Sequence, residues 1–294
     1  MIVLHGLRTD APLDAVRRVL AERGTPHLFL DQADCGAVAV TRRRDGLSLV
    51  VDGAEVPVDR VRGVYLRPYD IGDVVDLAEQ ERLARLASDL REWAEAAPAG
   101  VRVVNRPSAG LSNHSKPRQA QAVAAVGFAV PETLLTTDPA AATAFAARHG
   151  RVVVKSASGI RSIVRTVGPD DDLDAVRWCP TQLQRYVAGL EHRVHVVGER
   201  LFVHRIRSEA VDYRYGGFSI EPVDLPDDVA ARCRALTRLL GLELAGIDLR
   251  FGSDGRWYCW EANTSPAYST FDGPDRAIAH ALAAHLAHEE RADW

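Results

Sequence analysis

Lysine is almost absent from this sequence. Of the 36 basic residues only two, Lys116 and Lys155, are lysines, and the others are arginines. Arginine therefore serves wherever a positive charge alone is required. A lysine ammonium group is a compact point charge that suits phosphate, whereas arginine presents a planar fork. The two lysines either remain by chance on the surface, or they serve a ligand that carries phosphate.

Cysteines and long apolar runs are also scarce. The four cysteines are scattered and form no CxxC pair, which argues against a zinc site or a disulfide framework. No apolar run reaches the roughly 18 residues of a membrane span. The net charge of −4 provides no broad basic surface for nucleic acid. We therefore expect a cytoplasmic globular protein without nucleic-acid or membrane partners, and a homo-oligomer remains open.

The motifs of several enzyme classes are missing as well. No GxSxG sequence is present, and neither lysine follows a glycine-rich GxxxxGK run. His285 and His288 lie one turn apart on an expected helix, but such a pair is more typical of a solvated face than of a metal site. Nucleophilic catalysis therefore has no support in the sequence, and a Walker-type nucleotide-binding protein is excluded.

The first third of the chain alternates strands with helices. Strands are expected over residues 2–6, 27–31, 61–67 and 101–105, helices over 11–23 and 75–96, and a hairpin over 32–52. Such alternation predicts an α/β layer around a mostly parallel sheet. We therefore assign residues 1–106 to an N-terminal α/β domain that holds the substrate.

The rest of the chain divides into two further sections. Residues 106–115 are polar and are expected to form a linker. Helices are expected over residues 116–126, 139–149, 227–240 and 275–289, with strands over 131–136, 151–156, 162–167, 181–187, 192–197, 201–207 and a hairpin over 244–263. We assign residues 107–187 to a small central lid and residues 188–294 to a C-terminal α+β domain.

The hairpin near the C-terminus places two carboxylates together. Its turn signal is Asp254-Gly255, and side chains alternate between the two faces of each strand. With a two-residue loop, Asp248 lies opposite Glu261, and the same alternation assigns Tyr258 and Trp260 to the core face.

Facing carboxylates repel each other unless a cation lies between them. Asn263 adds an amide oxygen to the face that carries Asp248 and Glu261. Oxygen ligands of this kind suit magnesium, which takes its other ligands from water and phosphate. A metal site is therefore predicted, and the alternative is that Arg250, on the same face, neutralises the pair.

Each lysine occupies a position that favours an anion. Lys116 begins a helix, where backbone N–H groups and the helix dipole attract negative charge. Lys155 ends an apolar strand just before a small-residue segment, 156–159, whose backbone can approach a phosphate.

These features resemble one family. The matching motifs, in chain order, are Lys116, Lys155, Gln184-Arg-Tyr-Val-Ala-Gly189, Glu191-His-Arg193, Asp248 and Glu261-Ala-Asn263. Together they resemble the ATP-grasp superfamily, nearest to its RimK-like branch of carboxylate–amine ligases. The resemblance covers roughly residues 103–290. It implies an α/β and α+β fold with an N-terminal α/β domain, a central lid and a C-terminal catalytic domain, and with ATP in the cleft between the last two.

The resemblance also implies roles for individual residues. ATP would be bound by Lys116, Lys155, Ser158, Gly159, Gln184, Arg185, Tyr186, Val187 and Glu191. Asp248, Glu261 and Asn263 would hold two magnesium ions, with manganese as an alternative. Catalysis would use Arg193, Arg207 and Arg214 to stabilise phosphoryl charge. The sequence departs from the family in Arg185, where an acidic residue is common, in Glu191, where aspartate is usual, and in a short loop, 157–161.

The activity implied is ligation of a carboxylate to an amine through an acyl-phosphate. Substrates would be small molecules or peptides, and Asp212-Tyr213-Arg214 is similar to the branch that cyclises ribosomal peptides through ester or amide links. Arg67, at a strand end, is a candidate for the substrate carboxylate or else part of a salt bridge, and Arg161 is left open. The rival functions are an ATP-dependent phosphotransferase and a non-catalytic nucleotide-binding subunit.

Overall fold

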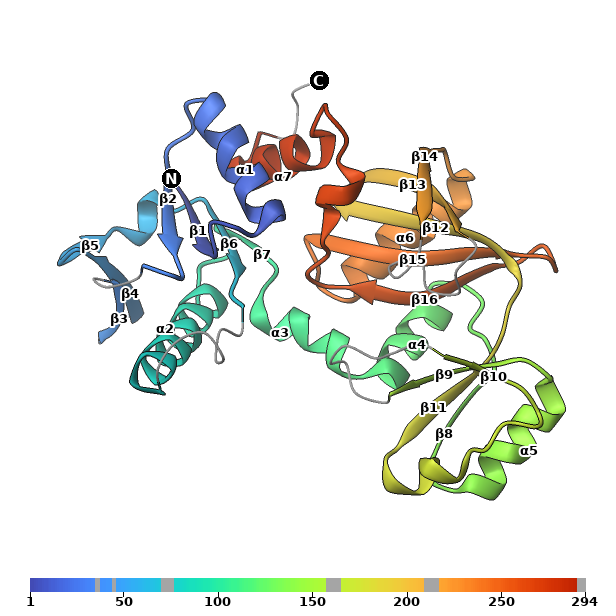
Figure 1. Cartoon of the computed structure of the whole chain (residues 1–294). Coiled ribbons are helices and arrows are strands. Elements are labelled where there is room, and N and C mark those ends of the chain that lie inside the picture. Colours follow the sequence, from blue (N-terminus) through green and yellow to red (C-terminus); the bar gives the residue numbers. More distant parts are fainter. Residues whose placement is uncertain (35–37, 44–45, 70–76, 157–164, 209–216, 290–294) are drawn as a thin grey trace.

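The structure is a computed structural model that describes residues 1–34, 38–43, 46–69, 77–156, 165–208 and 217–289. Within these residues the strands form four sheets, and Figure 1 shows how the sheets and helices are arranged. No helix in the described part of the chain is long and apolar enough to cross a membrane.

A parallel sheet forms the N-terminal section, as the alternation of strands and helices predicts. Its strand order is β2 (His27–Asp31), β1 (Ile2–Gly6), β6 (Gly63–Arg67) and β7 (Arg102–Val104). The amphipathic helices α1 (Ala11–Glu22) and α2 (Leu77–Glu95) pack on opposite faces, because alternate residues of β1 enter two different apolar clusters. All four strands run the same way, so their carboxyl ends lie along one edge.

The hairpin expected over residues 32–52 has a third strand. The antiparallel strands are β3 (Val38–Arg43), β4 (Gly46–Val51) and β5 (Ala54–Val56), followed by the short helix η1 (Val58–Arg60). Their apolar side chains pack against α2 in the second cluster.

The segment 106–115, which is expected to be a linker, is helical along most of its length. This segment forms α3 (Pro107–Gly110) and the 3-10 helix η2 (Leu111–His114). Proline at the first helical position is already set for a helix. In addition, the Glu95 carboxylate accepts hydrogen bonds from both the backbone N–H and the hydroxyl of Ser108.

An antiparallel sheet forms the central section. Its strand order is β10 (Arg165–Val167), β9 (Val152–Ser156), β11 (Thr181–Arg185) and β8 (Thr133–Thr136), with α4 (Lys116–Ala125) before it and α5 (Pro139–His149) and η3 (Asp174–Trp178) beside it. Phe145 of α5 packs against Val152 and Leu183, which defines the core face of this sheet. Because side chains alternate, Lys155 and Gln184 project from the other face.

A five-stranded antiparallel sheet forms the C-terminal section. The order is β14 (Phe218–Pro222), β13 (Arg200–Ser208), β12 (Gly189–Val197), β15 (Leu244–Gly252) and β16 (Trp257–Asn263). Helix α6 (Asp227–Leu239) covers one face, and η5 (Tyr268–Phe271) and α7 (Ala277–Ala287) lie on the other side. Strand β14 was not expected from the sequence.

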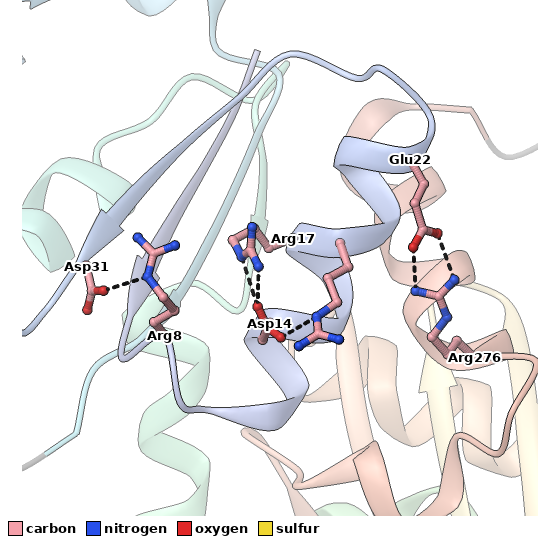
Figure 2. Close-up of polar contacts among 7 residues, drawn as sticks. Arg8, Asp14, Arg17, Glu22, Asp31 and Arg276 are labelled. Carbon is pink, nitrogen blue, oxygen red and sulfur yellow. Dashed lines mark hydrogen bonds and ion pairs between the residues drawn. The ribbon is translucent and has the colours of Figure 1, made fainter.

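Helix α7 joins the two ends of the chain into one core. Its buried residues share a cluster with Ile2 and Leu4 of β1 and with Leu244 of β15. Packing against β6 is so close that a Cβ on Gly63 would clash with the carbonyl of Leu286. Figure 2 shows polar contacts around α1, among them the paired hydrogen bonds from Arg276, just before α7, to Glu22.

Asn105, the residue after β7, connects the N-terminal sheet to the open end of the hairpin formed by β15 and β16. Its side-chain Nδ2 donates to the carbonyls of Leu244 and Thr264, both at 2.7 Å. Its Oδ1 accepts from the N–H groups of Glu243 at 2.7 Å and Leu244 at 3.0 Å. One side chain thus satisfies four backbone groups of the C-terminal section.

Replacing Asn105 by alanine should lower the free energy of unfolding by at least about 2 kcal/mol, because partly buried backbone groups then lose their partners. Urea unfolding followed by circular dichroism measures this change. Asn113→Ala is the matched control, since no residue in the described part of the chain hydrogen-bonds to the buried Oδ1 of Asn113. Equal losses of unfolding free energy in the two variants would show that the four hydrogen bonds of Asn105 do not stabilise the fold.

Candidate functional site

The two carboxylates of the hairpin face each other, as predicted. Asp248 lies directly opposite Glu261, although the turn differs from the expected two-residue loop. Gly252 N–H donates to the Arg256 carbonyl, so three residues form the loop. Regular pairing from that loop would place Trp260 opposite Asp248, but a shift of register beside Asp248 inserts one extra residue.

The three-residue loop reverses the faces expected for the first residues of β16, and the β-bulge restores the expected face at Glu261. Cys259 lies opposite Leu249 in the apolar cluster under α6, whereas Tyr258 lies opposite Arg250. The assignment of Tyr258 and Trp260 to the core face is therefore wrong, because a one-residue shift moves every side chain to the other face.

Trp260 is consequently a site residue that sequence reasoning missed. Its ring lies 5.4 Å from the Lys155 ammonium and 5.3 Å from the Arg250 guanidinium, both measured to the ring centroid. The indole N–H is buried and has no hydrogen-bond partner among the described residues. A bulge leaves no signal in an alternating pattern, so no feature of the sequence indicated this orientation.

The carboxylate pair is electrostatically poised for a cation. Burial raises the pKa of Glu261, and the facing Asp248 raises it further, while Lys155 and Lys116 oppose the shift. Arg250 does not neutralise the pair, because its guanidinium binds Glu191 and the Val187 carbonyl instead. The alternative interpretation of Arg250 is therefore wrong.

The donor set fits a magnesium ion. Asp248 and Glu261 face each other, and Asn263 continues the same strand with an amide oxygen that accepts from Ser265 N–H at 2.9 Å. Among the described residues no group of three or more His, Cys, Asp and Glu side chains could hold a metal ion. A site with few protein ligands suits magnesium, which keeps waters and takes phosphate oxygens.

Arg193 of β12 binds one of the two facing carboxylates. Its Nη1 donates to Asp248 Oδ1 at 2.6 Å, and its side chain is only 8% exposed. Its Nε donates to the Nε2 atom of the buried His195 at 3.3 Å. The space for this guanidinium exists because residue 246 is glycine, since a Cβ there would clash with it.

The two lysines lie near the carboxylates, on elements that belong to different parts of the fold. Lys116 Nζ, from the first residue of α4, donates to the Ser156 carbonyl at 2.7 Å. Lys155 Nζ, from β9, is 3.5 Å from Gln184 Oε1. Burial lowers the pKa of both ammonium groups, and in each case Glu261 opposes that shift. Both ammonium groups therefore interact electrostatically with the same carboxylate, that of Glu261.

The segment after β11 connects the central sheet to the C-terminal sheet. Tyr186 N–H donates to the Arg151 carbonyl at 3.0 Å, and the Tyr186 ring has Arg151 at 3.9 Å and Arg250 at 5.6 Å from its centroid. No described residue accepts a hydrogen bond from the Val187 N–H. Arg185 points elsewhere and donates to the Tyr258 hydroxyl at 3.1 Å.

The structure does not bring every expected residue to this face. Arg193 lies opposite His204 on β13, so Arg207, three residues further along, projects from the other face of that strand. Its side chain is 65% exposed and pairs with Glu221 of β14. Ser158, Gly159, Arg161 and Arg214 lie outside the described residues.

Arg67 is engaged within the protein. Its Nε donates to Asp10 at 2.5 Å, and both side chains are buried. Of the two interpretations left by the sequence, the structure therefore supports the salt bridge.

Comparisons with known proteins agree with this geometry. No family model matches the chain, and no match is found among curated proteins. Solved structures do match. An ATP-grasp ligase, PsnB, solved with a minimal precursor, is 29% identical with a TM-score of 0.80, and 98% of each chain is covered.

Two further structures share the fold at lower identity. A RiPP-associated ATP-grasp ligase of Chryseobacterium gregarium, solved with ADP and a leader and core peptide, is 20% identical with a TM-score of 0.82, covering 98% of this chain and 96% of that one. The macrocyclase MdnC of Microcystis aeruginosa, bound to its precursor peptide MdnA, is 22% identical with a TM-score of 0.78, covering 98% and 100%. The resemblance found in the sequence is thereby confirmed: solved structures that this chain matches over nearly its whole length are ATP-grasp ligases, and this similarity supports an enzyme of the ligase type.

Proposed function

We propose that this enzyme activates a carboxylate of a peptide with ATP and joins it to an amine, forming an amide bond through an acyl-phosphate. The observation that carries the proposal is the facing pair Asp248 and Glu261, together with both lysines of the chain, which lie close enough to interact electrostatically with Glu261. A peptide substrate is supported by the structures of PsnB, which was solved with a minimal precursor, magnesium and ADP, and also with a precursor peptide and AMPPNP.

Nucleotide would lie between the central sheet and the C-terminal sheet. Lys116 and Lys155 would bind its phosphates from two sides. The N–H of Val187, for which the described residues offer no acceptor, would meet the adenine edge, and Trp260 would lie close to the base and ribose. Residues 107–187 would then act as the lid, with the segment after β11 as its hinge and residues 1–106 as the substrate domain.

Magnesium would be held by Asp248, Glu261 and Asn263, and it would supply positive charge to the transferring phosphoryl group. Arg193 would hold Asp248 in place and add a second positive charge at the same point. Arg214 remains a candidate for the acyl-phosphate. Arg207 carries no such role here, because it projects from the opposite face of β13.

Replacing Lys155 by methionine should weaken ATP binding at least tenfold, a loss of about 1.4 kcal/mol or more. The melting temperature should stay unchanged or rise, because burial already disfavours this charge. Isothermal titration calorimetry and thermal unfolding measure the two effects. Arg165→Met is the control, since Arg165 belongs to the same sheet but lies opposite Val154, which projects from the core face. Equal ATP affinity in wild type and Lys155→Met would show that the lysine was retained by chance.

The Glu261→Gln variant should separate ligand binding from stability. Removing the charge relieves its repulsion with Asp248, so the protein without metal should be as stable as wild type or more stable. Magnesium should no longer strengthen ADP binding, with a loss of at least about tenfold. A fluorescent ADP analogue titrated with and without magnesium provides the measurement. A destabilised variant with normal magnesium dependence would mean that Glu261 has a structural role only.

An acyl-phosphate intermediate should be trapped by hydroxylamine. A panel of peptides with acidic side chains is first screened for ADP release, and any active peptide is then incubated with ATP, magnesium and concentrated hydroxylamine. Mass spectrometry should detect a hydroxamate of the peptide, and the Asp248→Asn variant should give none. Release of AMP would indicate adenylation instead, and phosphopeptide without any ligation would indicate a phosphotransferase.

A further inference from the structure

A buried ion pair lies at the carboxyl edge of the N-terminal sheet, away from the proposed lid. Arg67 is the last residue of β6, and Asp10 immediately precedes α1. Their side chains are 5% and 1% exposed, and Arg67 Nε donates to Asp10 Oδ2 at 2.5 Å. Burial opposes the charge on Arg67, but the neighbouring Tyr65 and Asp10 outweigh it and hold the pKa of the guanidinium above its usual value.

The pair is itself fixed by surrounding hydrogen bonds. The Tyr69 hydroxyl donates to Asp10 Oδ1 at 3.1 Å. The backbone of Tyr69 is held by the side-chain amide of Gln32, which accepts from its N–H at 2.8 Å and donates to its carbonyl at 2.6 Å. The Arg67 guanidinium is therefore held in place by residues that follow three different strands: Asp10 after β1, Gln32 after β2 and Tyr69 after β6.

The guanidinium reaches across to the segment that follows the proposed metal ligands. Arg67 Nη1 donates to Ser265 Oγ at 2.8 Å and to the Pro266 carbonyl at 3.3 Å. The N–H of Ser265 in turn donates to Asn263 Oδ1 at 2.9 Å. An amide oxygen has two lone pairs, so this bond fixes the Asn263 side chain and leaves one lone pair for another partner.

We propose that the Asp10–Arg67 pair is a positioning element of the metal site. By holding Ser265 and Pro266, it orients the Asn263 amide oxygen toward the ion that Asp248 and Glu261 bind. Asp10 and Arg67 touch neither metal nor nucleotide, and they act through Ser265. The inference rests on the proposed function, since it requires magnesium at this hairpin.

The chemistry of the pair supports this assignment over a purely stabilising one. A buried ion pair is weak evidence for stability, because desolvation of both charges offsets most of their attraction. Partners that orient metal ligands, by contrast, typically change metal affinity by ten- to a hundredfold when they are removed. The hydrogen bonds from Arg67 end on the segment that follows Asn263, where such an effect would be transmitted.

Two substitutions test the proposal without leaving Asp10 unpaired. Ser265→Ala removes one acceptor of Arg67 and preserves the ion pair. Arg67→Lys keeps a positive charge beside Asp10 but loses the fork that reaches Ser265. Ser269→Ala, on the neighbouring helix η5, and Glu22→Gln, which breaks the Arg276 pair between α1 and the start of α7, serve as controls.

For each protein, binding of a fluorescent ADP analogue is measured over a range of magnesium concentrations and in EDTA, alongside the melting temperature. The magnesium concentration for half-maximal binding should rise about tenfold in Ser265→Ala and Arg67→Lys. Affinity in EDTA should not change in either variant, and both controls should match wild type.

If both variants keep the wild-type magnesium requirement, the proposal is overturned, whatever happens to their melting temperatures. If the controls shift as much as the variants, the effect is not specific to the Arg67 contact and the proposal is again overturned. A wild-type protein that binds the analogue equally with and without magnesium would overturn the proposed function itself, which distinguishes the two failures.

Discussion

The site depends on the repulsion between Asp248 and Glu261. Their strands place them opposite each other, and burial makes the negative charge on Glu261 costly. The surrounding cations come from three different elements: Lys116 from α4, Lys155 from β9 and Arg193 from β12. A cation that enters between the carboxylates therefore relieves an electrostatic repulsion that the fold imposes. The positive charges nearby compensate for the same repulsion.

The fold fixes some members of this group more firmly than others. The carboxylates and Arg193 lie on the C-terminal sheet, which shares a single apolar core with the N-terminal sheet through α7. Lys155 lies on the central sheet, whose apolar cluster with α5 is separate. The proposed metal ligands and the carboxyl edge of β6 thus belong to one packed body, whereas Lys155, which is proposed to bind phosphate, belongs to another.

The sequence was informative where a pattern repeats regularly or where a residue type is rare. Alternation predicted the parallel sheet, the strands of the hairpin and the pairing of Asp248 with Glu261, and the scarcity of lysine indicated two residues that the structure places around one point. It failed where a local irregularity decides the outcome. The three-residue loop and the bulge cancel at Glu261, so the predicted pairing is correct although the predicted loop is not. Trp260, by contrast, lies near Lys155 and Arg250 instead of in the core. Arg207 and Arg250 were misjudged because charge alone does not reveal which partner a guanidinium will bind.

The distribution of amines on this protein gives the site an unusual chemical property. Apart from the N-terminal amine, which donates to the Arg60 carbonyl, Lys116 and Lys155 are the primary amines of the chain. Burial lowers the pKa of both, so a larger fraction of each is uncharged and nucleophilic near neutral pH than for an ordinary surface lysine. Acylating reagents can therefore modify few amines on this protein, and apart from the N-terminus those amines lie on the two sides of one proposed nucleotide cleft.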